Sequence, residues 1–564
     1  MNVASKLLAA VAGAAAIAGT LGVIATSGAG AQPRRTSVSH VLLISVDGLH
    51  QSDLAWYAAE HPDSTLAHLA RGGAQYTMAA TPVPSDSFPG MVGIATGGNP
   101  GTTGVYYDDT FNHDVYPAGT TNCTTATQGA EVTYFEALDL NFNTGLTIDA
   151  GQGLSGLPDS ILQMTGNPTT LINPAALPVD DHSCKPIYPN QYLKVNTIFD
   201  VIHNHGMLTA WSDKHPAYQI LNGPQGNGIT DLFTPEINAP ALMPGGTPWP
   251  GGIDYTGDNL ATQQYDSYKV QAVLNELDGF NHQRTKRVGV PAILGMNFQT
   301  VSTAEKLYIS SSTGLGGGYL PGTNTPGPLL SGALDYINAQ LTRMVQELRN
   351  RGLLESTAIV LTAKHGQSPL DPNQLVRVDD GPIMNAVNAD WQASHPGSGP
   401  IILGGTDDDA LMWWLTNRSQ SAADWVARFL MRHTFPGVTY AQTGTSNTTP
   451  VEHSGLVKIY AGAAAARFFH VPLNDPRHPD ILGVVRVGVV YTHGKKIAEH
   501  GGANPGDRHV PLVVYAPGVV AAGMRDAPVE TTQVAPTVLK LLGLNPMDLQ
   551  AVQIEHTQVL PGIG

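Results

Sequence analysis

The feature that most constrains the fold is a series of apolar, β-branched runs that end in polar residues and alternate with helical patterns. The clearest runs are SHVLLISVDGL (39–49), MLTAWSDKHPAY (207–218), PAILGMNFQTVS (291–302) and TAIVLTAKHGQSPLD (357–371). The helical patterns cover residues 62–71, 195–206, 334–352 and 531–544. Strands that are apolar along their whole length are typical of parallel sheets covered on both faces. The alternation predicts an α/β fold, doubly wound, with a largely parallel sheet flanked by helices and with loop or cap insertions.

Further segments complete this outline. Near the C-terminus, RVGVVYTHG (486–494) and VPLVVYAPG (510–518) are expected to be two more strands. Residues 81–109 and 222–256 are rich in Pro and Gly, which predicts loops. We expect a catalytic domain over residues 38–545, an insertion at about 110–190 and a C-terminal tail at 546–564.

Residues 1–31 have the pattern of a secretory signal peptide. Lys6 gives a positive start, the apolar stretch LLAAVAGAAAIAGTLGVIA follows, and AGA at 29–31 offers a small-residue cleavage site. A membrane anchor is the alternative, but the stretch is rich in Ala and Gly and only weakly hydrophobic. We therefore expect cleavage after Ala31 and a secreted or periplasmic protein without a membrane span.

The charge balance limits the partners. The chain has 29 Lys plus Arg against 45 Asp plus Glu, a net charge of −16, which argues against a nucleic acid polymer as partner. Local cations can still bind a small anion. The oligomeric state is not indicated by the sequence.

Two cysteines, Cys123 and Cys184, lie in the expected insertion. An exported protein with an even number of cysteines most often pairs them, so we predict one disulfide. A thiol metal site is the alternative, but no C-x-x-C spacing supports it.

Polar residues that could carry chemistry follow several of the apolar runs. They are Asp47, Ser87, His365 and His500, and each alone is a weak signal. Their order along the chain is more specific: a strand with Asp-Gly, then DSFPG, then a long helix with GLLESTAIVLTAKHG, and finally EHGG before a strand and a helix.

This order resembles the alkaline phosphatase superfamily, and within it the type I phosphodiesterase/nucleotide pyrophosphatase branch, over residues 38–545. The resemblance implies a two-zinc phosphoryl-transfer site at the carboxyl ends of the sheet, with a hydroxyl nucleophile. Asp47 matches an acid ligand, His365 and His500 match histidine ligands, and Ser87 matches the nucleophile.

The chain departs from the family pattern at two places. Lys364 stands where the family has the Asp of Asp-His-Gly, and NFQTVS, beginning at Asn297, stands where it has Asp-x-x-x-His. A lysine ammonium has no lone pair for a metal. We therefore expect at most one divalent ion, zinc by family resemblance, bound by Asp47, His365 and His500, with Lys364 replacing the charge of the other ion.

Nearby residues could complete the site. Asp213 and Lys214 follow a strand, and we expect them to surround the substrate together with Asn297. Asp407, Asp408 and Asp409 form a triplet that is either a solvated loop or part of the site. Arg477 suits a phosphate but more often pairs with a neighbouring acid.

The resulting hypothesis is an exported phosphoric-ester hydrolase of phosphodiesterase or phosphatase type that acts on a small phosphate ester through Ser87 and a reduced metal site. The sequence leaves two alternatives open. One is a sulfate-ester hydrolase of the same superfamily, and the other is a catalytically silent protein that binds a phosphorylated or sulfated ligand.

Overall fold

The computed structural model describes residues 37–154, 158–440 and 446–564, so the expected signal peptide lies outside the described residues. Within these ranges, none of the helices is both long enough and apolar enough to cross a bilayer.

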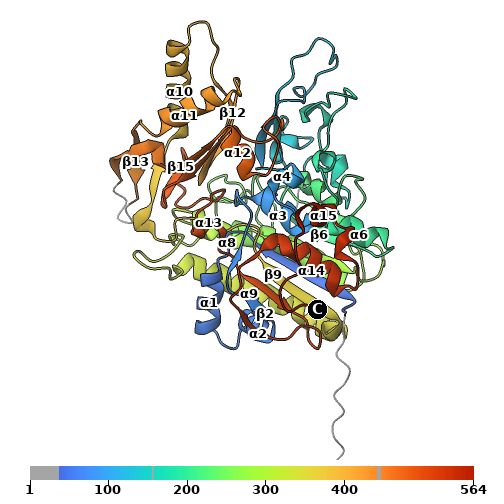
Figure 1. Cartoon of the computed structure of the whole chain (residues 1–564). Coiled ribbons are helices and arrows are strands. Elements are labelled where there is room, and N and C mark those ends of the chain that lie inside the picture. Colours follow the sequence, from blue (N-terminus) through green and yellow to red (C-terminus); the bar gives the residue numbers. More distant parts are fainter. Residues whose placement is uncertain (1–36, 155–157, 441–445) are drawn as a thin grey trace, which may run out of the picture. The chain divides into compact units, whose positions relative to one another are not determined.

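An eight-stranded sheet forms the centre of the fold (Figure 1). Its strand order is β19 (Gly523–Arg525), β2 (Ala74–Tyr76), β18 (Leu512–Tyr515), β9 (Thr357–Thr362), β1 (His40–Val46), β8 (Ile293–Phe298), β6 (Ala210–Ser212) and β7 (Asp231–Phe233). The strands from β9 to β7 are parallel, and β18 pairs antiparallel with both of its neighbours. The predicted α/β fold with a largely parallel sheet is confirmed.

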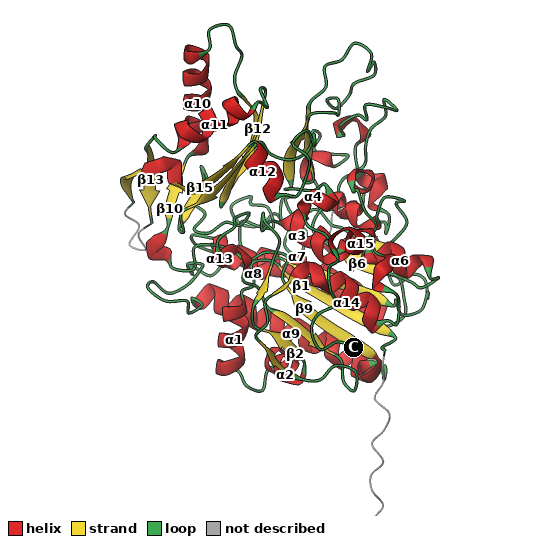
Figure 2. Ribbon diagram, in the orientation of Figure 1, coloured by secondary structure: helices red, strands yellow, loops and turns green. Residues whose placement is uncertain are grey.

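Helices cover both faces of this sheet, as Figure 2 shows. On β1, Val41 and Leu43 pack into one hydrophobic cluster, and Leu42, Ile44 and Val46 pack into another. The first cluster includes residues of α3 (Ser87–Thr96), α6 (Ile198–Asn204) and α14 (Val534–Leu541). The second includes residues of α1 (Gln51–Glu60), α2 (Thr65–Gly72), α7 (Asn259–Leu277), α8 (Thr300–Lys306) and α9 (Pro328–Asn350). Because both faces are buried, β1 is apolar from Val41 to Ile44.

One assignment made from the sequence was wrong, and one expected strand joins another sheet. Residues 222–256 are not simply a surface loop, because they contain β7, in which Leu232 and Phe233 are fully buried. The RVGVVYTHG segment forms β17 (Val489–Tyr491), which belongs to a separate four-stranded sheet and not to the central one. Periodicity identifies a strand but does not say which sheet it joins.

The residues between β9 and β18 build two further sheets. One has the order β14 (Asn447–Val451), β13 (Phe435–Thr439), β10 (Val376–Val378) and β17, and the other has the order β11 (Ile402–Asp407), β12 (Ala410–Leu415), β16 (Ile481–Val485) and β15 (Leu456–Ala461). Helices α10 (Asp380–Ser394) and α11 (Gln420–Leu430) share a hydrophobic cluster with strands of both sheets.

The long helix α7 was missed by the sequence analysis because polar residues interrupt its apolar stripe. Asp266 and Lys269 are fully buried and form an ion pair of 3.1 Å. The Asp266 carboxylate also accepts hydrogen bonds from the backbone N–H groups of Gln299 and Thr300 at the start of α8. This buried acid therefore fixes the turn that follows β8.

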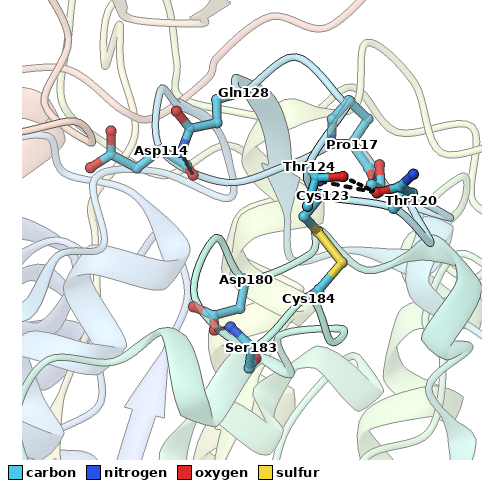
Figure 3. The surroundings of a disulfide bond; sticks show 10 residues. Asp114, Pro117, Thr120, Cys123, Thr124, Gln128, Asp180, Ser183 and Cys184 are labelled. Carbon is cyan, nitrogen blue, oxygen red and sulfur yellow. Dashed lines mark hydrogen bonds between the residues drawn. A yellow bond between two sulfur atoms is a disulfide. The ribbon is translucent and has the colours of Figure 1, made fainter.

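The predicted disulfide between Cys123 and Cys184 is confirmed (Figure 3). It joins the loop between β4 (Asp109–Asn112) and β5 (Ala130–Thr133) to a turn in which the Asp180 carboxylate accepts a hydrogen bond from Ser183 N. The two cysteines are separated by 61 positions.

Replacing both cysteines by serine should lower the free energy of unfolding by about 4 kcal/mol, because the cross-link restricts the unfolded chain over a loop of this length. Urea unfolding of the double variant and the wild type measures the difference. In addition, thiol titration of the unfolded, unreduced wild type should find no free thiol. Two titratable thiols would contradict the pairing.

Candidate active site

Three of the parallel strands, β9, β1 and β6, bring polar side chains to one edge of the central sheet, and β8 lies between β1 and β6. Asp47 follows β1, Lys364 and His365 follow β9, and Asp213 and Lys214 follow β6. Carboxyl ends of parallel strands share one edge of a sheet, where ligands bind in open α/β folds. The sequence prediction that these residues lie near one another therefore has a geometric basis in the strand order.

Ser87 is brought to this edge by helix α3. We expected Ser87 in a loop, whereas it is the first residue of the helix, with Asp86 as the N-cap that accepts a hydrogen bond from Phe88 N. The DSFPG sequence carries this signal, since Asp is a favoured N-cap and Pro is tolerated in the first turn. At Gly90, a Cβ atom would lie 2.0 Å from the Lys364 carbonyl oxygen, so glycine permits the helix to approach the β9 loop.

The Ser87 hydroxyl has polar neighbours from several segments, including Tyr218 as well as Lys214 and His365. Lys214 Nζ donates a hydrogen bond to Ser87 Oγ over 3.0 Å, and His365 Nε2 lies 3.3 Å from the same oxygen. Ser87 and His365 are buried, and the Lys214 side chain is 15% exposed. Only Lys214 of these three reaches toward solvent.

Asp47 is a fully buried carboxylate surrounded by donors and cations. Its Oδ2 accepts a hydrogen bond from Gln299 Nε2 at 2.7 Å and lies 3.2 Å from Lys364 Nζ. Lys214 Nζ and His365 Nε2 are each 3.6 Å from the same oxygen. Burial alone would raise the pKa of Asp47, but the neighbouring Lys364, His365 and Lys214 outweigh this effect and hold the pKa well below its usual range.

The Lys364 ammonium is completely buried among acceptors. Besides Asp47, it lies 3.9 Å from Asp213 Oδ1 and donates a hydrogen bond to Tyr218 Oη at 2.5 Å. From the sequence, we expected Lys364 to replace the charge of a missing ion. Its charge is directed at two carboxylates, and Lys214 contacts the hydroxyl of Ser87.

His500 contacts the site residues His365 and Asp86. Its ring centroid lies 4.1 Å from that of His365, and its Nδ1 lies 3.2 Å from Asp86 Oδ1. Burial lowers the pKa of both histidines, and for His500 the nearby Lys306 lowers it further. Burial raises the pKa of Asp86, although His365 opposes the shift.

A cavity of about 450 Å³ opens beside Lys214 and His500. Its charged lining residues are Lys214, Lys306, Lys496, Asp108, Glu136, Asp408 and Glu499. Lys306 Nζ binds Glu499 at 2.7 Å, and Lys496 also pairs with Glu499. Burial, followed by the charge of Asp86, raises the pKa of Asp108 to about 7. The Ser87 hydroxyl is therefore connected to this polar cavity by its hydrogen bond to Lys214, which lines the cavity.

Of the other residues that the sequence suggested for the site, some line the cavity and others do not. Asn297 is fully buried in β8, and neither polar atom of its amide has a hydrogen-bond partner among the described residues. The Asp407 to Asp409 triplet is not a solvated loop: Asp408 lines the cavity, and Asp409 is buried and accepts a hydrogen bond from Ser368. Arg477 stacks on Tyr192 and donates to its carbonyl oxygen, outside the cavity lining.

Sequence reasoning missed Gln299, Asp86 and Tyr218. Gln299 comes directly after β8, so its place at a strand end was a usable signal. Tyr218 lies in a 3₁₀ segment, Pro216–Asn222, and no sequence pattern connects it with Lys364.

The family profile of type I phosphodiesterase / nucleotide pyrophosphatase matches residues 41–507. The chain belongs to this family. The matched range contains all of the residues that surround Ser87, and the family consists of hydrolases of phosphoric ester bonds. Among curated proteins, none matches the chain in sequence.

Solved structures give a wider view of the fold. The wild-type alkaline phosphatase PafA is 14% identical, with 91% of this chain and 97% of that chain covered and a TM-score of 0.57. Murine ectonucleotide pyrophosphatase/phosphodiesterase 5 is 10% identical, with coverages of 90% and 96% and a TM-score of 0.49. Phosphonoacetate hydrolase from Sinorhizobium meliloti 1021, in complex with phosphonoformate, is 14% identical, with coverages of 90% and 96% and a TM-score of 0.47. At such identities, the likeness to PafA shows the shared fold alone.

The residues around Ser87 do not fit the two-zinc site that the family resemblance implies. Lys364 places a positive charge against Asp47, the carboxylate that would bind an ion. An ammonium and a divalent ion 4 Å apart repel each other by about 8 kcal/mol at an effective dielectric constant of about 20. Asn297 and the apolar Val301 stand at the positions of the Asp-x-x-x-His ligands.

The positions of the possible metal ligands also argue against a two-zinc site. Within the part of the chain that the structure describes, four groups of three His, Asp or Glu side chains bring ligand atoms within 4.8 Å of one another, and neither Asp47 nor His365 is in them. His500 is grouped with Asp408 and Glu499, but two lysines already pair with Glu499.

Lys364→Met should lower the free energy of unfolding by about 3–5 kcal/mol at neutral pH, because it leaves Asp47 charged and buried without its nearest cation. The folded-state pKa of Asp47 is below its unfolded value of about 3.9, so its ionic stabilisation is present above that pH and is lost as the pH falls through the folded pKa. Unfolding in urea at several pH values measures both effects.

The matched control is Lys194→Met. Lys194 pairs with Asp475 at 3.0 Å but is one-third exposed, so its loss should cost about 0–1 kcal/mol. Equal losses in the two variants would show that burial of Lys364 between carboxylates is not important for stability.

Proposed function

We propose that the protein is an exported phosphoric-ester hydrolase, of phosphodiesterase or phosphatase type, in which Ser87 is the nucleophile. Membership of the type I phosphodiesterase/nucleotide pyrophosphatase family supports the reaction class. The observation that carries the assignment of Ser87 is its hydroxyl, which contacts Lys214 and His365 directly beneath the cavity.

The position of Ser87 at a helix start supports this role. Phosphoryl transfer mainly requires positive charge and hydrogen-bond donors fixed around the phosphoryl oxygens. The N-terminus of α3 and the ammonium of Lys214 both provide positive potential at Ser87. Neutral imidazoles at His365 and His500 leave lone pairs available for proton transfer at neutral pH.

The size of the cavity supports a small substrate. A volume of about 450 Å³ accommodates a compact ester, in keeping with the range of small-molecule sites. Lys214 in the lining can bind anionic oxygens, whereas Lys306 and Lys496 are paired with Glu499. Under this proposal the substrate carries one phosphoryl group that enters beside Lys214.

Export is supported by the disulfide between Cys123 and Cys184, since such bonds persist in oxidising compartments. The expectation of at most one divalent ion stays a prediction, and the position of Lys364 supports the loss of at least one ion. Sulfate-ester hydrolysis and ligand binding without turnover are the competing functions, and they predict different assay results.

Ser87→Ala should abolish nearly all turnover of bis(p-nitrophenyl) phosphate or p-nitrophenyl phosphate, because the attacking oxygen is removed. The melting temperature should stay within a few degrees. Steady-state kinetics and thermal unfolding test both points, with p-nitrophenyl sulfate as the substrate that reports sulfatase activity.

Ser454→Ala is the matched control. Ser454 is also buried and donates to the Leu430 carbonyl oxygen at 2.9 Å, and neither residue lines the cavity, so this variant should keep the wild-type rate. Wild-type turnover in Ser87→Ala would disprove the nucleophile, and turnover of the sulfate ester alone would favour the sulfatase.

A further inference from the structure

If the site does not hold two zinc ions, another group must activate the Ser87 hydroxyl. The identification of that group rests on the proposed function, in which Ser87 is the nucleophile. Family resemblance implies that an ion activates the nucleophile, but here the cations nearest to Asp47 are the ammonium groups of Lys364 and Lys214. An ammonium supplies charge without a coordination bond. Another group must then accept the Ser87 proton.

The hydrogen bonds of His365 identify that group. His365 Nδ1 lies 3.0 Å from the Gly366 carbonyl oxygen, which can only accept, so Nδ1 carries the ring hydrogen. The lone pair of Nε2 then faces Ser87 Oγ at 3.3 Å. This assignment fixes the neutral tautomer of the ring.

The neighbours of Ser87 agree with this orientation. Lys214 Nζ donates to Ser87 Oγ at 3.0 Å and occupies one acceptor position of the hydroxyl. A lysine ammonium cannot accept a hydrogen bond, and the Tyr218 hydroxyl, which also interacts with Ser87, already accepts from Lys364. The Ser87 hydroxyl hydrogen can therefore point at His365 Nε2. Asp47 Oδ2 lies 3.6 Å from Nε2, where a negative charge stabilises an imidazolium once it forms.

We propose that the chain hydrolyses phosphoric esters without a resident divalent metal ion, with His365 as the base for Ser87 and Lys214 as the cation that binds the phosphoryl oxygens. Lys364 is a positioning residue in this arrangement, since it holds Asp47 and Asp213 but does not line the cavity. The site thus resembles a serine–histidine pair built at the edge of an alkaline phosphatase-like sheet.

The reaction balances with the groups present. The Ser87 proton moves to His365 Nε2 as Oγ forms a bond to phosphorus, and the ester P–O bond breaks. The leaving oxygen takes the proton from the imidazolium. Water then attacks the phosphoseryl group and gives a proton to His365, the Oγ–P bond breaks, and the proton returns to Ser87 as phosphate, or a phosphate monoester from a diester, is released.

The first test measures metal dependence in the full-length wild-type protein. Elemental analysis of the purified chain should find no stoichiometric zinc or other divalent metal. Turnover of bis(p-nitrophenyl) phosphate and p-nitrophenyl phosphate should be unchanged after exhaustive treatment with EDTA and should not rise on addition of Zn²⁺. Activity that EDTA removes and Zn²⁺ restores would overturn the metal-free site while leaving the proposed function intact.

Absence of turnover of either ester, with and without Zn²⁺, gives a different result. It would overturn the proposed function and, with it, this inference. The two failures are therefore distinguishable in the same set of assays.

The second test addresses the base, with all assays in EDTA so that added imidazole cannot act through a metal. His365→Ala should lower kcat by about 10²–10⁴, the range for a lost general base, and added imidazole should restore part of the rate. His478→Ala is the matched control, because His478 is equally buried but contacts Arg418 and Asp475 outside the cavity lining.

The control should keep the wild-type rate and show no response to imidazole. A His365→Ala variant that folds, as judged by its melting transition, but keeps the wild-type rate would overturn the assignment of the base. So would a loss of rate that imidazole does not rescue at any concentration.

Discussion

The buried carboxylate of Asp47 is the interaction on which the rest of the site depends. Its Oδ2 accepts a hydrogen bond from Gln299, which follows β8. The same oxygen lies close to the side-chain nitrogens of Lys364 and His365, which follow β9, and of Lys214, which follows β6. A buried carboxylate without such partners would be strongly destabilising. One oxygen atom therefore ties four loops of the sheet edge together and sets the positions of two groups that contact Ser87.

The charges around Asp47 show how a phosphoryl-transfer fold can change its chemistry while it keeps its architecture. The family profile covers most of the chain and the fold resembles that of the alkaline phosphatase PafA, yet an ammonium lies against the acid that would bind an ion. Fixed lysine charges and metal ions can both stabilise phosphoryl oxygens. A lysine provides no coordination bond, so proton transfer falls to a neighbouring imidazole.

The sequence was most informative where a local pattern sufficed. The strands β1, β8 and β9 are mostly apolar, and they were recognisable because both faces of each strand are buried. The pattern could not assign β17 to its own sheet, and it did not reveal α7, whose buried Asp266 and Lys269 neutralise each other inside the protein. Partners distant in sequence decide both cases.

By itself, the sequence determined which charged groups stand at the ends of the strands, and the family resemblance implied that Lys364 stands in the place of a carboxylate ligand. Only the tertiary structure decided what each lysine does. Packing beneath Tyr218 directs the Lys364 ammonium into the protein toward Asp47 and Asp213, whereas Lys214 extends from β6 to the Ser87 hydroxyl beside the cavity. Side-chain direction follows from contacts between segments far apart in the chain, and local sequence does not encode them.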